Sequence, residues 1–108
     1  MSVRLTAEFW VAAYRARLEA AGTPVYVTAR GDPTAGDVLV KLAPLDGTAR
    51  LYGRMADLDG TRSWAVVAEG PEVEVDATAA RRRAVDPDLW LIEVEARDGD
   101  ARLDEAGL

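Results

Sequence analysis

Residues 6–30 read TAEFWVAAYRARLEAAGTPVYVTAR, and within them the hydrophobic period changes from that of a helix to that of a strand. Apolar side chains first recur at steps of three and four, as on one face of a helix: Ala7, Trp10, Val11, Tyr14, Leu18 and Ala21. From residue 25 the period becomes two, as in a half-buried strand. Thr6 can cap the helix and Gly22 can end it. We therefore expect a helix over 6–21 and a strand directly after it.

The rest of the chain continues with strand patterns that are separated by turn residues. Alternating apolar residues, with Asp-Gly pairs between several of the runs, predict further strands over 38–42, 50–55, 63–68 and 89–95. Pro71 and the acidic residues after it suit the start of a second helix over 72–84, because carboxylates stabilise the positive end of the helix dipole. The element order is then helix, four strands, helix, strand. It predicts an α+β fold with a mostly antiparallel five-stranded sheet and two helices packed on one face.

Length and composition indicate a single domain over 1–108. The chain is 49% apolar and 30% charged, and a domain of about 100 residues can bury a core of its own. We expect residues 98–108, after the last strand, to form a loosely held C-terminal tail. No apolar run approaches the roughly 20 residues of a membrane-spanning helix. No signal peptide is visible either, so we expect a cytoplasmic protein with no membrane partner.

The chain lacks the side chains on which most catalysis depends. It has no histidine, no cysteine and only two serines, Ser2 and Ser63, whereas catalysis at neutral pH usually needs an imidazole, a thiolate or an activated hydroxyl. Its acidic pairs, two residues apart, do not complete a calcium-binding loop. The only lysine, Lys41, lacks the carboxylate two residues earlier that metal-dependent nucleases carry. We predict no catalytic residue, no metal site and no cofactor, and an enzyme is disfavoured.

The net charge of the chain disfavours binding to nucleic acid. The net charge is −6, although twelve of the thirteen basic residues are arginine. An acidic protein repels the phosphate backbone on average unless its arginines cluster in space. We therefore expect no nucleic-acid binding.

Four stretches of the sequence carry a resemblance to a known family. They are LTAEFWVAAYRAR (5–17), GDPTAGDVLVK (31–41), WAVVAEGPEVEVDA (64–77) and DPDLWLIEVE (86–95). In these stretches, which cover nearly the whole chain, the sequence resembles a small family of mostly alphaproteobacterial proteins, domain of unknown function family 1491. The resemblance implies a single small domain with the predicted element order. It implies no activity, ligand or catalytic residue.

Two further features have both a structural and a functional interpretation. The loop RGDPTAG (30–36) is bracketed by glycines but lacks the pattern of a phosphate-binding loop, so we expect a turn in which glycine supplies a positive φ. Trp10, Trp64 and Trp90 could form a stacking platform for a base or a sugar. Each lies on the apolar side of its own element, however, and that position favours the core.

One candidate binding surface remains, on the sheet face turned away from the helices. The candidate binding residues on it are Tyr26, Arg30, Arg50, Tyr52 and Arg54. Arginine and aromatic side chains are enriched in binding hot spots, so we predict a non-catalytic binding or adaptor protein that contacts a protein partner or forms a homodimer. A solvated face with cross-strand Arg–Glu pairs would show the same pattern. The alternative function is a small-molecule or phosphate-ester binding protein or enzyme that uses arginine and carboxylates.

Overall fold

The computed structural model describes residues 5–56, 58–60 and 62–103. Its elements follow one another in this order: α1 (Ala7–Ala20), β1 (Val25–Ala29), β2 (Val38–Ala43), β3 (Thr48–Ala56), β4 (Arg62–Pro71), α2 (Glu72–Val85) and β5 (Trp90–Glu95). The predicted α+β class and the predicted element order are confirmed. No helix among the described residues is long and apolar enough to cross a membrane.

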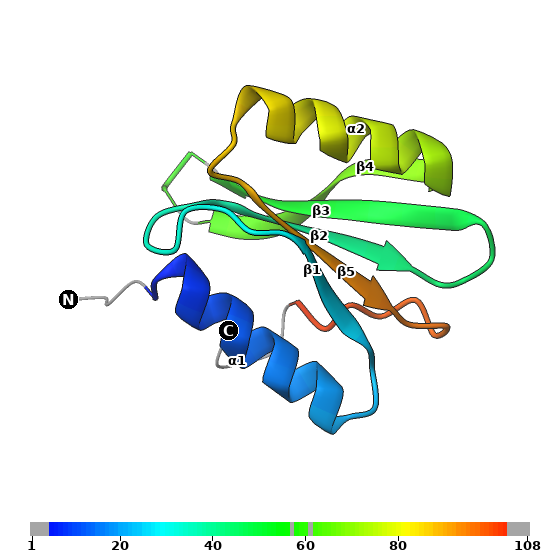
Figure 1. Cartoon of the computed structure of the whole chain (residues 1–108). Coiled ribbons are helices and arrows are strands. Elements are labelled where there is room, and N and C mark those ends of the chain that lie inside the picture. The colour runs from blue at the N-terminus through cyan, green and yellow to red at the C-terminus, as the bar shows by residue number, and fades with distance from the viewer. Residues whose placement is uncertain (1–4, 57, 61, 104–108) are drawn as a thin grey trace.

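The five strands form one sheet in the order β1-β5-β2-β3-β4. The last strand of the chain therefore lies between the first two (Figure 1). The β2–β5 pair is parallel, because α2 carries the chain across the sheet before β5 begins, and the other three pairs are antiparallel. The sheet is mostly antiparallel, as predicted, with this one parallel pair at its centre.

The two helices lie on opposite faces of the sheet, with α2 above it and α1 below it in Figure 1. The prediction that both helices pack on one face was wrong. The side chains packed with α1 include Val40 and Ile92, whereas those packed with α2 include Leu39 and Leu51. Successive residues of β2 therefore serve different cores, and all six of them are buried. A strand covered on both faces is apolar almost throughout, and this is the character of VLVKLA.

The segment after β5 packs onto α1. Ala101 and Leu103 are buried, and the Tyr14 hydroxyl donates a hydrogen bond to the Ala101 carbonyl at 2.7 Å. Arg17 Nη2 donates to the Arg102 carbonyl at 3.0 Å. Residues 98–103 are therefore not loosely held, and this part of the predicted tail was wrong, because two apolar side chains complete the core beneath α1. The rest of the predicted tail, 104–108, lies outside the described residues.

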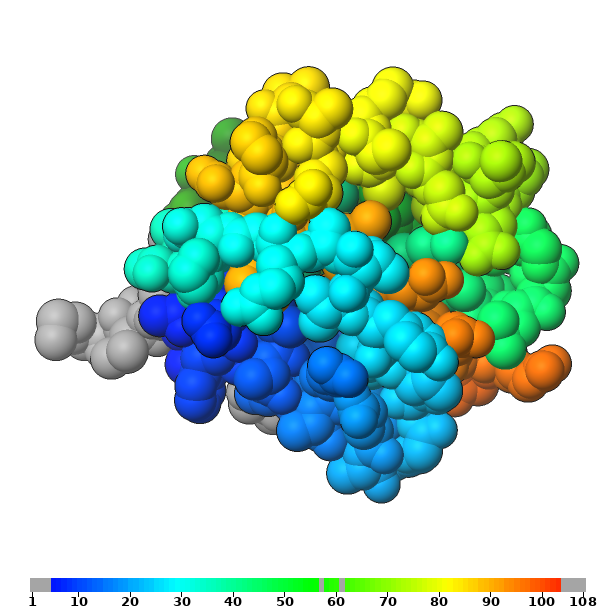
Figure 2. Space-filling view, in the orientation of Figure 1, coloured from blue at the N-terminus to red at the C-terminus, as the bar shows by residue number. Residues whose placement is uncertain are grey.

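The glycine-bracketed loop has a structural role that differs from the one we expected. A Cβ on Gly31 would lie 2.1 Å from the Asp88 carbonyl oxygen, and one on Gly36 would lie 2.3 Å from the same atom. Neither glycine has a positive φ. Both are needed because the loop passes directly against the backbone before β5. Trp90 Nε1 also donates to the Asp32 carbonyl at 2.7 Å, and the loop crosses between α1 and α2 in Figure 2.

Replacement of Trp90 by alanine is expected to destabilise the protein by about 3–5 kcal/mol, the usual effect of removing a large aromatic side chain from a core. Trp90 is 1% exposed and would leave both a cavity and an unpaired Asp32 carbonyl. Urea unfolding measures the change. Val85→Ala, at an 87% exposed position, is the control and should change stability by less than about 0.5 kcal/mol. Equal stabilities of the two variants would contradict the core assignment.

Candidate functional site

The structure brings three of the five predicted binding residues together. Arg50, Tyr52 and Arg54 alternate along β3 on the face that α1 covers, because Tyr52 pairs with the α1-side residue Val40 of β2. Tyr26 pairs with Glu93 and lies on the opposite face. The negative charge of Glu95, more than any other neighbour, raises the pKa of Tyr26. Tyr26 therefore belongs to acidic surroundings and not to the arginine group.

Arg30 is also separated from the β3 residues. Its guanidinium carbon lies 4.9 Å from the ring centroid of Trp90, and it forms a 3.9 Å ion pair with Glu8 of α1. These partners place Arg30 beside β5 and the N-terminal half of α1, with β2 between it and β3. The predicted set of five thus divides into three groups.

Two residues of β4 complete the surface around the β3 residues. Trp64 pairs with Arg54 and Val66 pairs with Tyr52, so both lie on the same face. We call the five residues Arg50, Tyr52, Arg54, Trp64 and Val66 the arginine–aromatic face. Its members are half-buried or exposed: Val66 is 45% exposed and the Arg50 side chain is 55% exposed.

Arg54 joins this face to the aromatic core. Its guanidinium carbon lies 5.0 Å from the Trp10 ring centroid and 4.8 Å from that of Trp64. The two indole centroids are 5.3 Å apart, and Trp10 stacks on Tyr14 at 4.9 Å. Trp10 and Trp90 are core residues, as predicted, whereas Trp64 is only partly buried. Cation–π contacts hold Arg54 in a defined position.

A pocket lies beside Arg54, between the start of α1, the 34–38 loop and the ends of β3 and β4. Its volume is about 510 Å³, and its polar lining includes Thr6, Asp37, Arg54 and Arg62. Arg62 Nη2 donates to the Asp37 carboxylate at 2.7 Å. Trp10 also lines the pocket, and its buried Nε1–H has no acceptor among the residues that the structure describes. An unsatisfied buried donor is unfavourable by about 1–3 kcal/mol.

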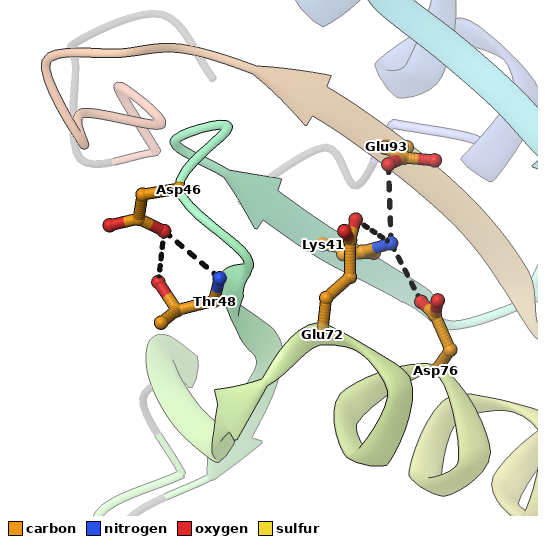
Figure 3. A network of polar contacts seen from close by, with 6 residues as sticks. All are labelled: Lys41, Asp46, Thr48, Glu72, Asp76 and Glu93. Carbon is orange, nitrogen blue, oxygen red and sulfur yellow. Dashed lines mark hydrogen bonds and ion pairs between the residues drawn. The ribbon is translucent and has the colours of Figure 1, made fainter.

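A second polar site was missed by the sequence analysis. Lys41 is buried in the middle of β2, and its Nζ lies 2.8 Å from Glu72, 2.7 Å from Asp76 and 3.2 Å from Glu93 (Figure 3). Glu72 and Asp76 are one turn apart on α2, and Glu93 is the register partner of Lys41 on β5. The sequence does carry a signal for this site. A single lysine interrupts an apolar strand, and two acids four residues apart, Glu72 and Asp76, begin the second helix.

The three carboxylates determine the chemistry of Lys41. Burial alone would lower the pKa of the amine, but hydrogen bonds to Asp76, Glu72 and Glu93 outweigh burial and raise that pKa. An ammonium has three donors, and three carboxylates surround this one. Lys41 is therefore a charged structural group and not a neutral amine nucleophile. Among the described residues, no three acidic side chains are arranged to hold a metal ion.

Comparisons with known proteins agree with this architecture. The family model described as "Protein of unknown function (DUF1491)" matches residues 5–104. The crystal structure of a DUF1491 family protein from Caulobacter crescentus CB15 is 40% identical, with a TM-score of 0.86 and coverage of 94% of this chain and 97% of that chain. An NMR structure of a DUF1491 family protein from the same organism is 40% identical, with a TM-score of 0.84 and 96% of both chains covered.

The solution structure of protein Atu0922 from A. tumefaciens is also similar, at 30% identity and a TM-score of 0.74 over 87% of both chains. Comparison with functionally curated proteins finds no match. The solved relatives therefore support the fold and carry no function to this chain.

Replacement of Lys41 by methionine is expected to destabilise the protein by about 1–3 kcal/mol at neutral pH, because three carboxylates lose their shared cation. Their side chains are 26–53% exposed, so water limits the loss. A raised folded-state pKa means that the lysine contribution is present at neutral pH and declines above the unfolded value of about 10.4. Urea unfolding of both proteins should therefore show their difference narrowing with alkaline pH. A constant difference, or none, would contradict this assignment.

Proposed function

The chain belongs to the DUF1491 family, and from that premise we propose that it is a non-catalytic binding protein that recognises a protein partner through the arginine–aromatic face. The proposal depends on one observation. A single strand presents Arg50, Tyr52 and Arg54 on one side, directly beside Trp64 and Val66. Arginine, tyrosine and tryptophan are the residue types most enriched in binding hot spots.

The geometry of this face favours recognition over simple solvation. Sheet strands hold its side chains at fixed spacing, and the contacts of Arg54 with two indole rings restrict its guanidinium. Preorganised side chains lose less conformational entropy on binding. A solvated face needs no such arrangement, and half-buried Trp64 would be an unusual choice for one.

The charges on the face indicate the chemistry of the partner. Arg50 already forms an ion pair with Glu69 at 3.1 Å, so its guanidinium is oriented to donate hydrogen bonds to a carboxylate on this face. The rest of the chain is acidic, with a net charge of −6, and its arginines on β3 concentrate positive charge locally. The partner surface that fits is an acidic segment with an apolar side chain to contact Val66 and Trp64.

The same observations support binding without catalysis. The chain has no histidine and no cysteine, and its one buried amine is held as an ammonium by three carboxylates. A general base or a nucleophile would have to come from exposed carboxylates or hydroxyls, which are weak in both roles at neutral pH.

Charge reversal on the face tests the proposal. The variant Arg50→Glu places a second acid beside Glu69 and so removes the positive charge that an acidic partner would contact at this part of the face. We expect it to bind an immobilised glutamate-rich peptide about thirtyfold or more weakly, because loss of a hot spot costs about 2 kcal/mol or more. Its melting temperature should be almost unchanged.

The matched control is Arg82→Glu, an exposed arginine on α2, on the other face of the sheet. It should retain both peptide binding and the set of proteins that the wild type captures from its host. If Arg50→Glu binds as the wild type does, the arginine–aromatic face is not the binding surface. If Arg82→Glu loses binding equally, the attraction is only a general effect of charge.

The pocket supports a second candidate function, the binding of a small oxyanion such as a phosphate ester. Its volume of about 510 Å³ falls in the range of ligand sites. Arg54 and Arg62 would supply positive charge, and an anionic oxygen would give Trp10 Nε1 an acceptor. Arg62 retains further donors besides the one bound to Asp37, because a guanidinium has five.

Inorganic phosphate and citrate are expected to raise the melting temperature by several degrees if the pocket binds oxyanions, since a ligand at about a hundred times its Kd adds about 2.7 kcal/mol. Sodium chloride at equal ionic strength is the control. Arg62→Gln should remove the shift, whereas Arg50→Glu, whose site does not line the pocket, should keep it. No shift with either anion would reject this candidate and leave the first unaffected.

A further inference from the structure

The outer side of β4 is a long, largely apolar sheet edge. β4 is the last strand of the sheet and spans ten residues, whereas β1 at the other edge spans five. Among the described residues, no strand pairs with β4 on its outer side. Its central residues, 64–68, read WAVVA and carry no charge. Edge strands usually avoid pairing by lysines, prolines, bulges or shortness, and of these β4 has one bulge. β4 has no lysine and a proline only at its last position.

One extra residue in β4 changes which side chains share a face. Leu51 pairs with Ala68 but Tyr52 pairs with Val66, so Val67 has no partner position of its own on β3. Without this bulge, Arg62 and Glu69 would lie on opposite faces, since they are an odd number of residues apart. With it, both lie on the α1 side of the sheet. Along this side β4 presents a cation, an indole, a β-branched residue and an anion: Arg62, Trp64, Val66 and Glu69.

We infer that β4 pairs in antiparallel fashion with β4 of a second copy, around a two-fold axis at Ala65. In this register Trp64 lies opposite Val66 of the partner subunit. Because Val67 is the extra residue of the bulge, Arg62 lies opposite Glu69 of the partner subunit. Two-fold symmetry repeats both pairs. Opposite charges and aromatic–β-branched pairs are the cross-strand combinations that stabilise antiparallel sheets. The result joins two five-stranded sheets into one, with an isologous interface.

The self-complementary order of the side chains selects a second copy over an unrelated peptide. A strand that carries its cation at one end and its anion at the other matches itself only when the two copies run antiparallel. Both side chains remain accessible to a neighbouring molecule: Glu69 is 61% exposed and Arg62 is 32% exposed, while each also forms an ion pair within the chain, with Arg50 and with Asp37. Among the described residues, the outer edge of β4 stays open: α2 contacts β3 and β4 from the other face, and α1 reaches the α1 side of β4 through Trp10, which packs on Trp64.

Dimerisation of this kind goes beyond the proposed function and does not depend on it, because it needs no second protein. Sedimentation equilibrium of the purified chain over a wide concentration range should show a mass that approaches twice the monomer mass of 11.6 kDa. Val66→Lys should keep the protein monomeric at every concentration. The matched control is Tyr26→Lys on the other edge strand, at a position 49% exposed against 45% for Val66, and it should dimerise as the wild type does.

A charge exchange tests the register. Arg62→Glu and Glu69→Arg should each weaken the dimer at least tenfold, and the two changes together should restore it, because each pair is then opposite in charge again. Melting curves of all variants verify that they are folded. A monomeric wild type, equal effects of Val66→Lys and Tyr26→Lys, or a double variant no tighter than its singles would each overturn the inference. The Arg50→Glu variant, which acts on partner binding, should leave the mass unchanged.

Discussion

Lys41 can lie at the centre of the sheet only because carboxylates from two other elements reach its ammonium. All six residues of β2 are buried, so a charge there must be neutralised within the protein. Glu72 and Asp76 come from the first turns of α2, and Glu93 comes from β5. The interaction therefore connects β2, α2 and β5. α2 must lie over β2, and β5 must lie beside it, for the charge to be satisfied.

This arrangement also explains where the exposed surfaces are. On one face α2 covers β3 and β4 and reaches Lys41 of β2 through Glu72 and Asp76, whereas α1 and residues 101–103 cover the other face nearer β1 and β5. The α1 side of β3 and β4 is left partly uncovered, and there the chain places arginine and aromatic side chains. In a protein with a net charge of −6, this is the surface that we propose contacts a carboxylate of another molecule.

The proposed binding surface and the proposed dimer interface adjoin each other. Pairing of two β4 strands would place two arginine–aromatic faces on the same side of one continuous sheet. A partner with two acidic segments could then engage both faces, and the second contact would form at a high effective concentration. Val67, the extra residue of β4, links the two features, because it sets the face on which Glu69 lies and thereby its pairing with Arg50.

The sequence alone determined the elements and their order, because helical and strand periodicity, the Thr6 cap and the turn residues act within a few positions of one another. It also indicated the burial of Trp10 and Trp90. The tertiary structure decided which face each strand presents, since a shift of one residue in register moves every side chain to the other side. Arg50, Tyr52 and Arg54 lie on the same strand, so the structure keeps them on one face as predicted. Tyr26 and Arg30 belong elsewhere in the sheet and were separated from them. The partners of Lys41 and the close approach at Gly31 depend on residues far along the chain, and only the folded protein brings those residues into contact.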